Sequence, residues 1–344
     1  MKKNKDSIIL GIESSCDDTS AAILKNGVLL SNITASQGVH QKFGGVVPEL
    51  ASRAHQENIV PTVDAAIKEA GIDIKDITAI AFTRGPGLLG SLLVGTSFAK
   101  SLSMSLNIPL LDVHHMKAHV HAHFIQEKNI DYTPPSFPFI CLTVSGGHTQ
   151  IVYVENPLKM KVIGETIDDA IGEAFDKAGK LLGLGYPAGP LIDKHAKLGD
   201  SNKYEFTYPK ANALNYSFSG LKTQFLYFLN KNIKENANFI NENLQHISAS
   251  YQSHLINYLL INFKKALKKY PCNDIAIAGG VSANSHLRKK FTALGKELKC
   301  KVHIPKMSFC TDNAAMIAMS GFFLEKEGKF SDLEVSASAR ITMN

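Results

Sequence analysis

Two similar strand–turn–strand segments, one in each half of the chain, constrain the fold most strongly. Each has two short apolar strands around a polar or glycine-containing turn, at 8–13 and 19–24 in the first half and at 139–144 and 149–154 in the second. Each half later continues with an apolar strand, at 79–83 or 274–278, a glycine turn and a helical stretch. Residues 56–70 also have the spacing of a helix. Strands that alternate with helices are typical of α/β domains. The sequence therefore predicts two architecturally related α/β domains.

The glycine turns indicate a shared ligand. Glycine lets backbone N–H groups approach an anion closely, and a helix N-terminus beyond the turn adds its dipole. Any one of these turns is equally typical of an ordinary tight turn. Four of them at corresponding places favour a nucleotide or another phosphorylated ligand held in a cleft between the domains.

Composition and proline content suggest where the domains divide. The chain has 344 residues, of which 44% are hydrophobic and 20% charged, as expected for two globular domains. The proline-rich segment 131–138 is typical of a connector. We expect an N-terminal domain at 1–130, completed by a C-terminal helix at 313–344, and a second domain at 131–312. The asparagine-rich stretch 230–247 is expected to be a polar insertion.

Neither a secretory signal nor a membrane span is predicted. The apolar run near the N-terminus lasts only from Ile8 to Ile12, shorter than the roughly 7–15 residues of a signal core. No apolar stretch approaches the ~18–20 residues of a transmembrane helix. The five cysteines form no C-x-x-C pair, which suits free thiols in a reducing compartment. We expect a soluble cytoplasmic protein.

The charge balance permits an anionic partner without requiring one. The formal net charge is +6, from 37 basic and 31 acidic residues. Basic residues gather in the second half, where they form either a solvated helix face or a surface that contacts phosphates. These residues are Lys264, Lys265, Lys268, Lys269, Arg288, Lys289 and Lys290.

His115 and His119 form the sharpest chemical motif. An i, i+4 pair places two imidazoles on one helix face, where both can bind one metal ion. The zinc-protease motif H-E-x-x-H would need a glutamate general base at 116, where this chain has Met116. Asp312, just before an apolar helix, is a candidate third ligand. As a helix N-cap it would need no further role, and spacing alone leaves both interpretations open.

Acidic side chains near other turns are further candidates. Asp17 and Asp18 lie in the first polar turn, where they are either solvated turn acids or groups that hold a cation or act as a base. Asp169, Glu173 and Asp176 are spaced to share one helix face. The glycine- and proline-rich segment 183–190 is expected to be a rigid loop that cradles a ligand.

Eight ordered motifs resemble one known family over nearly the whole chain. The bacterial TsaD family, the tRNA adenosine threonylcarbamoyltransferases once described as O-sialoglycoprotein endopeptidases, has similar motifs in the same order. The motifs are GIESSCDDTS (11–20), GGVVPELASRAH (44–55), RGPGLLGSLLVG (84–95), VHHMKAH (113–119), TVSGGHTQ (143–150), DDAIGEAFDKAGKLLGLGYPAGP (168–190), GGVSAN (279–284) and CTDNAAMIA (310–318).

The resemblance implies a fold and a reaction. The fold would be the actin/Hsp70/sugar-kinase type, a ribonuclease H-like α/β architecture of two domains around a cleft. The enzyme, an acyltransferase, would move a threonylcarbamoyl group from threonylcarbamoyl-AMP to the exocyclic amine of an adenosine and release AMP. That adenosine lies just after the anticodon in tRNAs that read codons beginning with A.

The resemblance also implies site residues and partners. One divalent metal per subunit, iron(II) in preference to zinc, would bind His115, His119 and Asp312, and Asp17 would be catalytic. Members of the family work with a paralogous partner, TsaB, and an ATPase, TsaE, which we expect here together with tRNA. The substrate-binding positions implied are Thr143, Val144, Ser145, Gly146, Gly147, Asp176, Gly189, Asp193 and Asn284.

Three alternative functions compete with this interpretation. A sugar or acetate kinase of the same fold would bind ATP with magnesium, which prefers oxygen ligands to a histidine pair. A metalloprotease would lack its general base at Met116. A non-catalytic scaffold would have no need of a metal-binding cleft.

Overall fold

The computed structural model describes residues 6–209 and 211–343, and the chain divides into two compact units. The first unit contains the chain up to Pro134, the short segment Asn156–Met160 and everything described from Pro305 onward. The second contains Pro135–Glu155 and Lys161–Ile304. The chain therefore leaves the first unit and returns to it, so that its N-terminal and C-terminal parts share one core.

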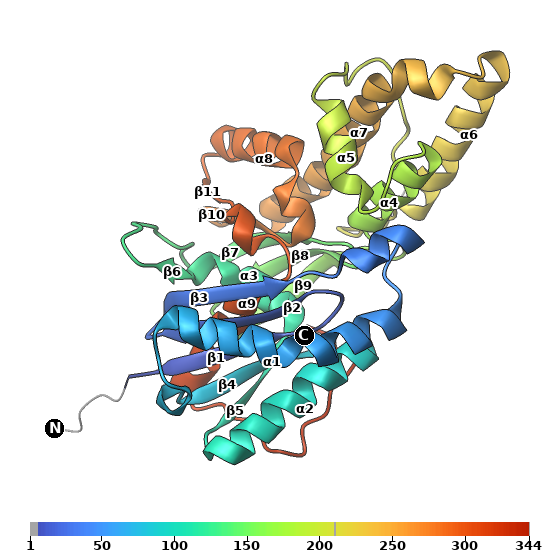
Figure 1. Ribbon diagram of the computed structural model, residues 1–344. Helices are drawn as coiled ribbons and strands as arrows, with labels where there is room; N and C mark the ends of the chain where they lie inside the picture. The colour runs from blue at the N-terminus through green and yellow to red at the C-terminus, as the bar shows by residue number, and fades with distance from the viewer. Residues whose placement is uncertain (1–5, 210, 344) are drawn as a thin grey trace. The chain divides into compact units, whose positions relative to one another are not determined.

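A mixed six-stranded sheet forms the centre of the first unit, in the order β5-β4-β1-β2-β3-β6 (Figure 1). β1 and β2 form an antiparallel hairpin that β3 extends, whereas β4 and β5 run parallel to β1. The strands are β1 (Ile8–Glu13), β2 (Thr19–Lys25), β3 (Val28–Ala35), β4 (Ala79–Gly85), β5 (Leu110–His114) and β6 (Gln126–Glu127). The expected strands at 8–13 and 19–24 match β1 and β2 within one residue.

Both faces of this sheet are covered, which explains why β1 has no polar side chain from Ile8 to Ile12. Ile8, Leu10 and Ile12 pack on one side with helices α1 (Pro48–Ala70) and α2 (Leu89–Leu106). Ile9 packs on the other side with α9 (Ala314–Lys326) and with Ala118 of the short helix α3 (His115–His121). In Figure 1, α1 and α2 cross the front of the sheet.

Two helix boundaries differ from the sequence expectation. α1 starts at Pro48, earlier than the expected 56–70, because proline is well suited to a first helical turn, and it ends before Gly71 at φ 66°. The C-terminal helix, expected at 313–344, spans only Ala314–Lys326. Beyond it Ser331 forms a bridge with Leu110 of β5, so that the chain end still packs on the first unit.

A five-stranded sheet forms the centre of the second unit, in the order β11-β10-β7-β8-β9. β7 and β8 form the antiparallel hairpin, and β10 runs parallel to both β7 and β11. The central strand of each sheet therefore has an antiparallel hairpin partner on one side and a parallel strand on the other. The strands are β7 (Phe139–Val144), β8 (Thr149–Val154), β9 (Met160–Glu165), β10 (Asp274–Ala278) and β11 (Lys301–His303).

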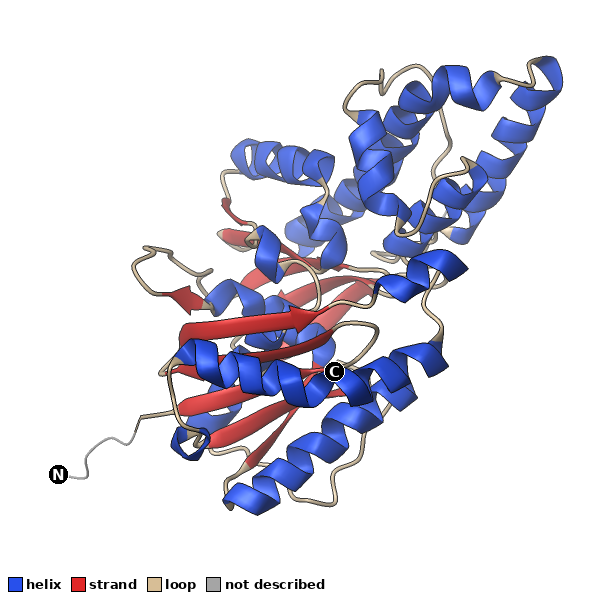
Figure 2. Ribbon diagram, in the orientation of Figure 1, coloured by secondary structure: helices blue, strands red, loops and turns tan. Residues whose placement is uncertain are grey.

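Helices make up much of the second unit (Figure 2), and they supply most of its buried core. They are α4 (Ile171–Leu181), α5 (Ala188–Ala196), α6 (Ser219–Glu235), α7 (Phe239–Lys269) and α8 (Ser285–Leu298). The expectation of a polar insertion at 230–247 is wrong, because this stretch forms the end of α6 and the start of α7. Phe239 and Ile247 anchor α7 in the core despite the asparagines around them.

No helix within the described part of the chain is long and apolar enough to cross a membrane.

Gly11 sets how closely α9 approaches β1. A methyl group at this position would collide with the Ala314 carbonyl oxygen and lie 2.7 Å from the Ala318 backbone nitrogen. Replacing Gly11 with Ala should therefore push α9 away from the sheet and lower the free energy of unfolding by about 1–3 kcal/mol, the usual cost of overpacking. Denaturant unfolding monitored by circular dichroism measures the change.

Gly38 provides the matched control for that substitution. A methyl group there would meet no atom within 4 Å, so Gly38→Ala should change stability by less than about 0.5 kcal/mol. Equal effects of the two substitutions would contradict the tight packing of α9 on β1.

Candidate functional site

The histidine pair lies on α3, directly after β5. The ring of His114 caps this helix by accepting a hydrogen bond from the backbone N–H of Met116 at 3.2 Å. The next residue, His115, and His119 one turn later have ring centroids 4.7 Å apart. The helical geometry predicted from their spacing is thus present, and both rings are buried.

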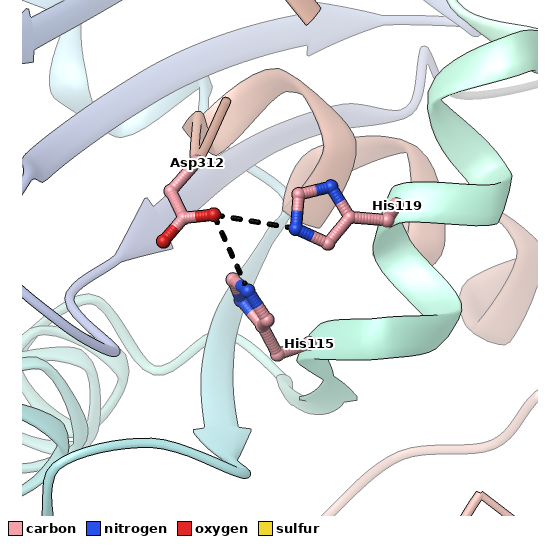
Figure 3. A group of neighbouring side chains, drawn as sticks. All are labelled: His115, His119 and Asp312. Carbon is pink, nitrogen blue, oxygen red and sulfur yellow. Dashed lines mark ion pairs between the residues drawn. The ribbon is translucent and has the colours of Figure 1, made fainter. Parts of the chain in front are cut away.

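Asp312 reaches this pair from the other end of the sequence. Its Oδ1 lies 3.4 Å from Nε2 of His115 and 3.2 Å from Nε2 of His119 (Figure 3). The N-cap of α9 is Asn313, whose side chain accepts from the Met316 N–H at 3.0 Å. Of the two interpretations left open by the sequence, capping therefore belongs to Asn313, and the Asp312 carboxylate faces the histidines.

These three residues could hold a metal ion. Their potential ligand atoms all lie within 4.8 Å of one another. Ligand atoms about 2.1 Å from one tetrahedral ion would be roughly 3.4 Å apart, close to the two separations seen here. His119 is fully buried, its Nε2 faces Asp312, and no hydrogen-bond partner of its Nδ1 is found within the described residues. A buried imidazole in that state is suited to coordination.

Charge within the group favours cation binding. Burial by itself raises the pKa of Asp312, but the neighbouring His115 and His119 outweigh this and hold it well below its usual value. Burial lowers the pKa of His115, whereas Glu13 and Asp312 raise it well above its usual value. The site therefore stabilises positive charge at the imidazole, where a proton and a metal ion compete for the same lone pair.

Glu13 is a buried neighbour of the group that the sequence analysis did not single out. It is the last residue of β1, is 0% exposed, and its Oε2 lies 3.0 Å from Nδ1 of His115. The sequence feature that could have identified Glu13 is that it is a glutamate at the end of an otherwise apolar strand. Such a residue needs a buried partner, since an unpaired buried charge is costly.

The first turn brings Asp17 and Asp18 close to this region. Both are partly buried, and the carboxylates of Asp17, Asp312 and Glu13 all contribute to the environment of Asp18. Burial is the largest cause that raises the pKa of Asp18, to about 6. The resemblance implies that Asp17 is catalytic, and Asp18 is the next acid in the same turn.

The glycine turn of the second unit joins β7 to β8 and contacts the start of α4. Thr143 and Val144 are the buried end of β7, and Ser145, Gly146 and Gly147 form the turn that follows. The Ser145 carbonyl accepts from the N–H of Gly172 at 3.2 Å. Methyl groups on Gly146 or Gly147 would meet no atom within 4 Å, so the turn has open space beside it.

Two further pairs of expected substrate-binding residues come together within the second unit. Asp176 accepts from the N–H of Ala188 at 2.8 Å and from that of Gly189. Asp193 accepts from the Ser285 hydroxyl at 2.9 Å, next to Asn284, which caps α8. The loop expected at 183–190 ends earlier, because α5 already begins at Ala188 and includes Gly189.

The three acids expected to share a helix face separate into two groups. Lys177 contacts both Asp169 and Glu173, at 2.5 and 2.8 Å. Asp176 instead turns toward the start of α5, as described above. The spacing was correct for a helix, but Asp169 lies just before α4 begins.

Solved structures with a similar fold define the class to which the protein belongs. HypF from T. kodakarensis superposes with a TM-score of 0.61 at 15% identity, over 94% of this chain and 48% of that chain. Component A of (R)-2-hydroxyglutaryl-CoA dehydratase from Acidaminococcus fermentans gives 0.50 at 14% identity, over 94% of this chain and 99% of that chain. At such identities the likeness concerns the fold alone. It is the actin/Hsp70/sugar-kinase class, as the sequence predicted.

Relatives of similar sequence identify the family. Residues 28–319 match the TsaD family, described as tRNA N6-adenosine threonylcarbamoyltransferase. A protein of this description from Christiangramia forsetii is 56% identical over 332 residues, covering 96% of this chain and 97% of the relative. Another, from Riemerella anatipestifer, is 54% identical over 340 residues and covers 99% of both chains. The chain therefore belongs to the TsaD family.

His121 gives a test of the buried histidine environment beside the candidate site. Its Nδ1 lies 2.7 Å from the Ser320 hydroxyl and its Nε2 lies 2.7 Å from the Pro157 carbonyl oxygen. Burial lowers its pKa to about 4. In the unfolded chain this histidine is protonated near pH 6.5, whereas in the folded chain it stays neutral down to about pH 4. The free energy of unfolding therefore falls as the pH drops through this range.

We expect His121 to account for a loss on the order of 2–3 kcal/mol between pH 7 and pH 4. Denaturant unfolding of chelator-treated protein at several pH values measures it, and His121→Gln should flatten the dependence. The same substitution at the partly exposed His195 serves as the control. If His121→Gln leaves the acid dependence unchanged, other groups are responsible for it.

Proposed function

We propose that this chain transfers the threonylcarbamoyl group of threonylcarbamoyl-AMP to the exocyclic amine of a tRNA adenosine and releases AMP. The target is the adenosine just after the anticodon in tRNAs that read codons beginning with A. The observation that carries this proposal is the 56% identity, over 96% of the chain, with a protein described as tRNA N6-adenosine threonylcarbamoyltransferase.

The reaction defines what the residues have to do. A bond forms between the adenine N6 and the carbamoyl carbon, the bond from that carbon to the AMP oxygen breaks, and N6 loses one proton. The lone pair of N6 is delocalised into the ring, which makes it a poor nucleophile. Positioning the two substrates can therefore supply several kcal/mol of the required rate enhancement.

His115, His119 and Asp312 would hold one divalent ion, iron(II) in preference to zinc. Two imidazoles and a carboxylate suit either ion. Their fit is supported by the separations of their ligand atoms and by the burial of both imidazoles. When bound, the ion would supply Lewis acidity toward oxygen atoms of the substrate.

Asp17 would accept the proton of the adenine amine or align that amine. Its position in the turn after β1, near the Asp312 group, supports this role. Asp18 is the competing candidate, since a carboxyl group with a pKa of about 6 is better matched to a base that works near neutral pH.

In the second unit, the backbone of Ser145, Gly146 and Gly147 would hold the adenylate, together with Thr143 and Val144 beside them. The open space next to the two glycines supports this role. Further contacts would come from the pairs Asp176 with Gly189 and Asp193 with Asn284. The carboxylates of Asp176 and Asp193, which lie at the starts of α5 and α8, are suited to accepting hydrogen bonds from hydroxyl or amine groups of the ligand.

Partners follow from the same proposal. Basic residues near the end of α7 and on α8, including Lys268, Lys269 and Arg288, would contact the phosphates of tRNA. A TsaB-like paralogue and a TsaE-like ATPase would assist the reaction, and the protein would work in the cytoplasm. Gel filtration of the mixed proteins, followed by the transfer assay with and without the partners, tests that requirement.

The alternative functions have less support. Met116, which replaces the glutamate of the zinc proteases, is only 1% exposed and packs in the core. A kinase that depends on magnesium would not be expected to bury two histidines beside one carboxylate. A scaffold would not be expected to keep that group at the cost of burying charge.

Replacing His119 with Ala tests the metal proposal and the activity together. We expect the variant to lose bound metal and threonylcarbamoyl transfer, because the site would keep only two ligands. Elemental analysis measures the metal, and nucleoside analysis of unmodified tRNA incubated with threonylcarbamoyl-AMP measures transfer. His121→Gln, on the same helix but outside the group, should keep both. Full metal content in His119→Ala would disprove the assignment.

Replacing Asp17 with Asn tests the proton-transfer role. The variant should keep its metal and bind the adenylate, but transfer roughly 10²–10⁴-fold more slowly, the usual contribution of a general base. Single-turnover assays measure the rate, and calorimetry measures adenylate binding. Asp18→Asn is the matched comparison, one residue away. A larger loss there, with Asp17→Asn near the parent rate, would move the role to Asp18.

A further inference from the structure

Neither the stability of the protein nor substrate binding accounts for the contacts of the buried Glu13 side chain. It ends β1 with its side chain completely buried, at 0% exposure. A carboxylate in such a place is expensive unless donors surround it, and an apolar residue of similar size would often be at least as stable. Its contacts therefore indicate what keeps it there.

Three donors from three parts of the first unit converge on this carboxylate. The Ser15 N–H donates to Oε1 at 2.5 Å, and the Thr83 hydroxyl of β4 donates to Oε2 at 2.7 Å. Nδ1 of His115, at the start of α3, lies 3.0 Å from Oε2. The Ser15 and Thr83 contacts hold the carboxylate in place at the end of β1. The carboxylate in turn holds the imidazole of His115 in one orientation.

The ring of His115 is oriented by this contact. An ionised carboxylate only accepts hydrogen bonds, so Nδ1 must carry the proton. Nε2 then presents its lone pair, and this is the nitrogen that faces Asp312 at 3.4 Å. The Ser15 hydroxyl also lies near Nδ1, at 3.2 Å, but the carboxylate is closer and charged.

Glu13 is not itself placed as a ligand. Its carboxylate contacts Nδ1 of His115, whereas Asp312 faces the other ring nitrogen, Nε2. Glu13 is also not among the three residues whose potential ligand atoms lie close together. His119 offers a contrast, because its Nε2 also faces Asp312 but no hydrogen-bond partner of its Nδ1 is found within the described residues. His115 is therefore the ligand whose tautomer and orientation the fold determines.

We infer that Glu13 is a positioning residue that holds His115 in the Nδ1–H tautomer and so sets the affinity of the centre for a divalent cation. This rests on the proposed metal site at His115, His119 and Asp312. Carboxylates that hydrogen-bond the far nitrogen of a metal-binding histidine orient the ring and raise its basicity, and their loss typically costs about 10–100-fold in metal affinity.

Two substitutions separate orientation from charge. Glu13→Met has nearly the same length but no acceptor, and it should weaken zinc binding by about 10–100-fold, measured by competition with a chromophoric chelator. Glu13→Gln keeps an acceptor oxygen without the charge and should give a smaller loss. Ser31→Ala is the control: Ser31 is also buried in this sheet, and its hydroxyl bonds to the Ala66 carbonyl away from the histidines.

A second measurement reports the tautomer directly. Because Glu13 and Asp312 raise the pKa of His115 well above its usual value, the measurement is made on metal-free protein at an alkaline pH where this imidazole is neutral. Nitrogen-15 NMR of the histidine-labelled protein should then show a protonated Nδ1 for His115 in the parent and a mixed or Nε2–H form in Glu13→Met. A purely structural role for Glu13 would lower the melting temperature without changing this signal. If Glu13→Met does not fold, the same two measurements on Glu13→Gln decide the question.

The outcomes also distinguish this inference from the proposed function. If the parent protein binds no divalent metal, or His119→Ala keeps its affinity, the proposed metal site fails. If His119→Ala loses metal while both Glu13 variants bind zinc within about twofold of the parent, only the positioning role of Glu13 is overturned.

Discussion

The close approach of helix α9 to the first sheet is the packing constraint on which the candidate metal centre depends. Gly11 of β1 leaves room for the backbone of Ala314 and Ala318, and a methyl group on Gly321 would lie 2.6 Å from the Cβ of Ala81 in β4. Larger residues at either glycine would separate helix and sheet. Because Asp312 lies just before α9, the same contacts determine how near its carboxylate comes to His115 and His119 of α3.

Local geometry explains which part of this centre the sequence could predict. The spacing of His115 and His119 is a property of one helical turn, so it needs no knowledge of the fold. Asp312 joins them only through tertiary packing, and spacing could not separate ligand from cap until Asn313 was found to cap α9. Glu13 was missed because its role appears only when β1, β4 and α3 meet.

The fold shows the same division between local and tertiary signals. Strands such as 139–144 and 274–278 were predicted at their observed bounds because apolar runs between turns are a local signal. The stretch 230–247 was misjudged because asparagines disfavour helix interiors. Burial of Phe239 and Ile247 outweighs that preference in α7. Likewise Pro190, taken for a loop residue, lies in the first turn of α5, where proline is tolerated.

The charges near α3 suit the proposed bound cation better than they suit stability. Glu13 and Asp312 are acidic groups beside His115 and His119. Together with burial, their charges help to raise the pKa of the nearby Asp18 to about 6. Glu13 and Asp312 favour a proton on His115, whose pKa they raise well above its usual value. If a metal ion takes the place of that proton, both imidazoles are neutral and the two ionised acids contribute two negative charges in a poorly solvated region. Apolar residues there would cost less to bury. Two negative charges are what one divalent ion neutralises, so the acids that favour the proton are those that would favour the ion in its place.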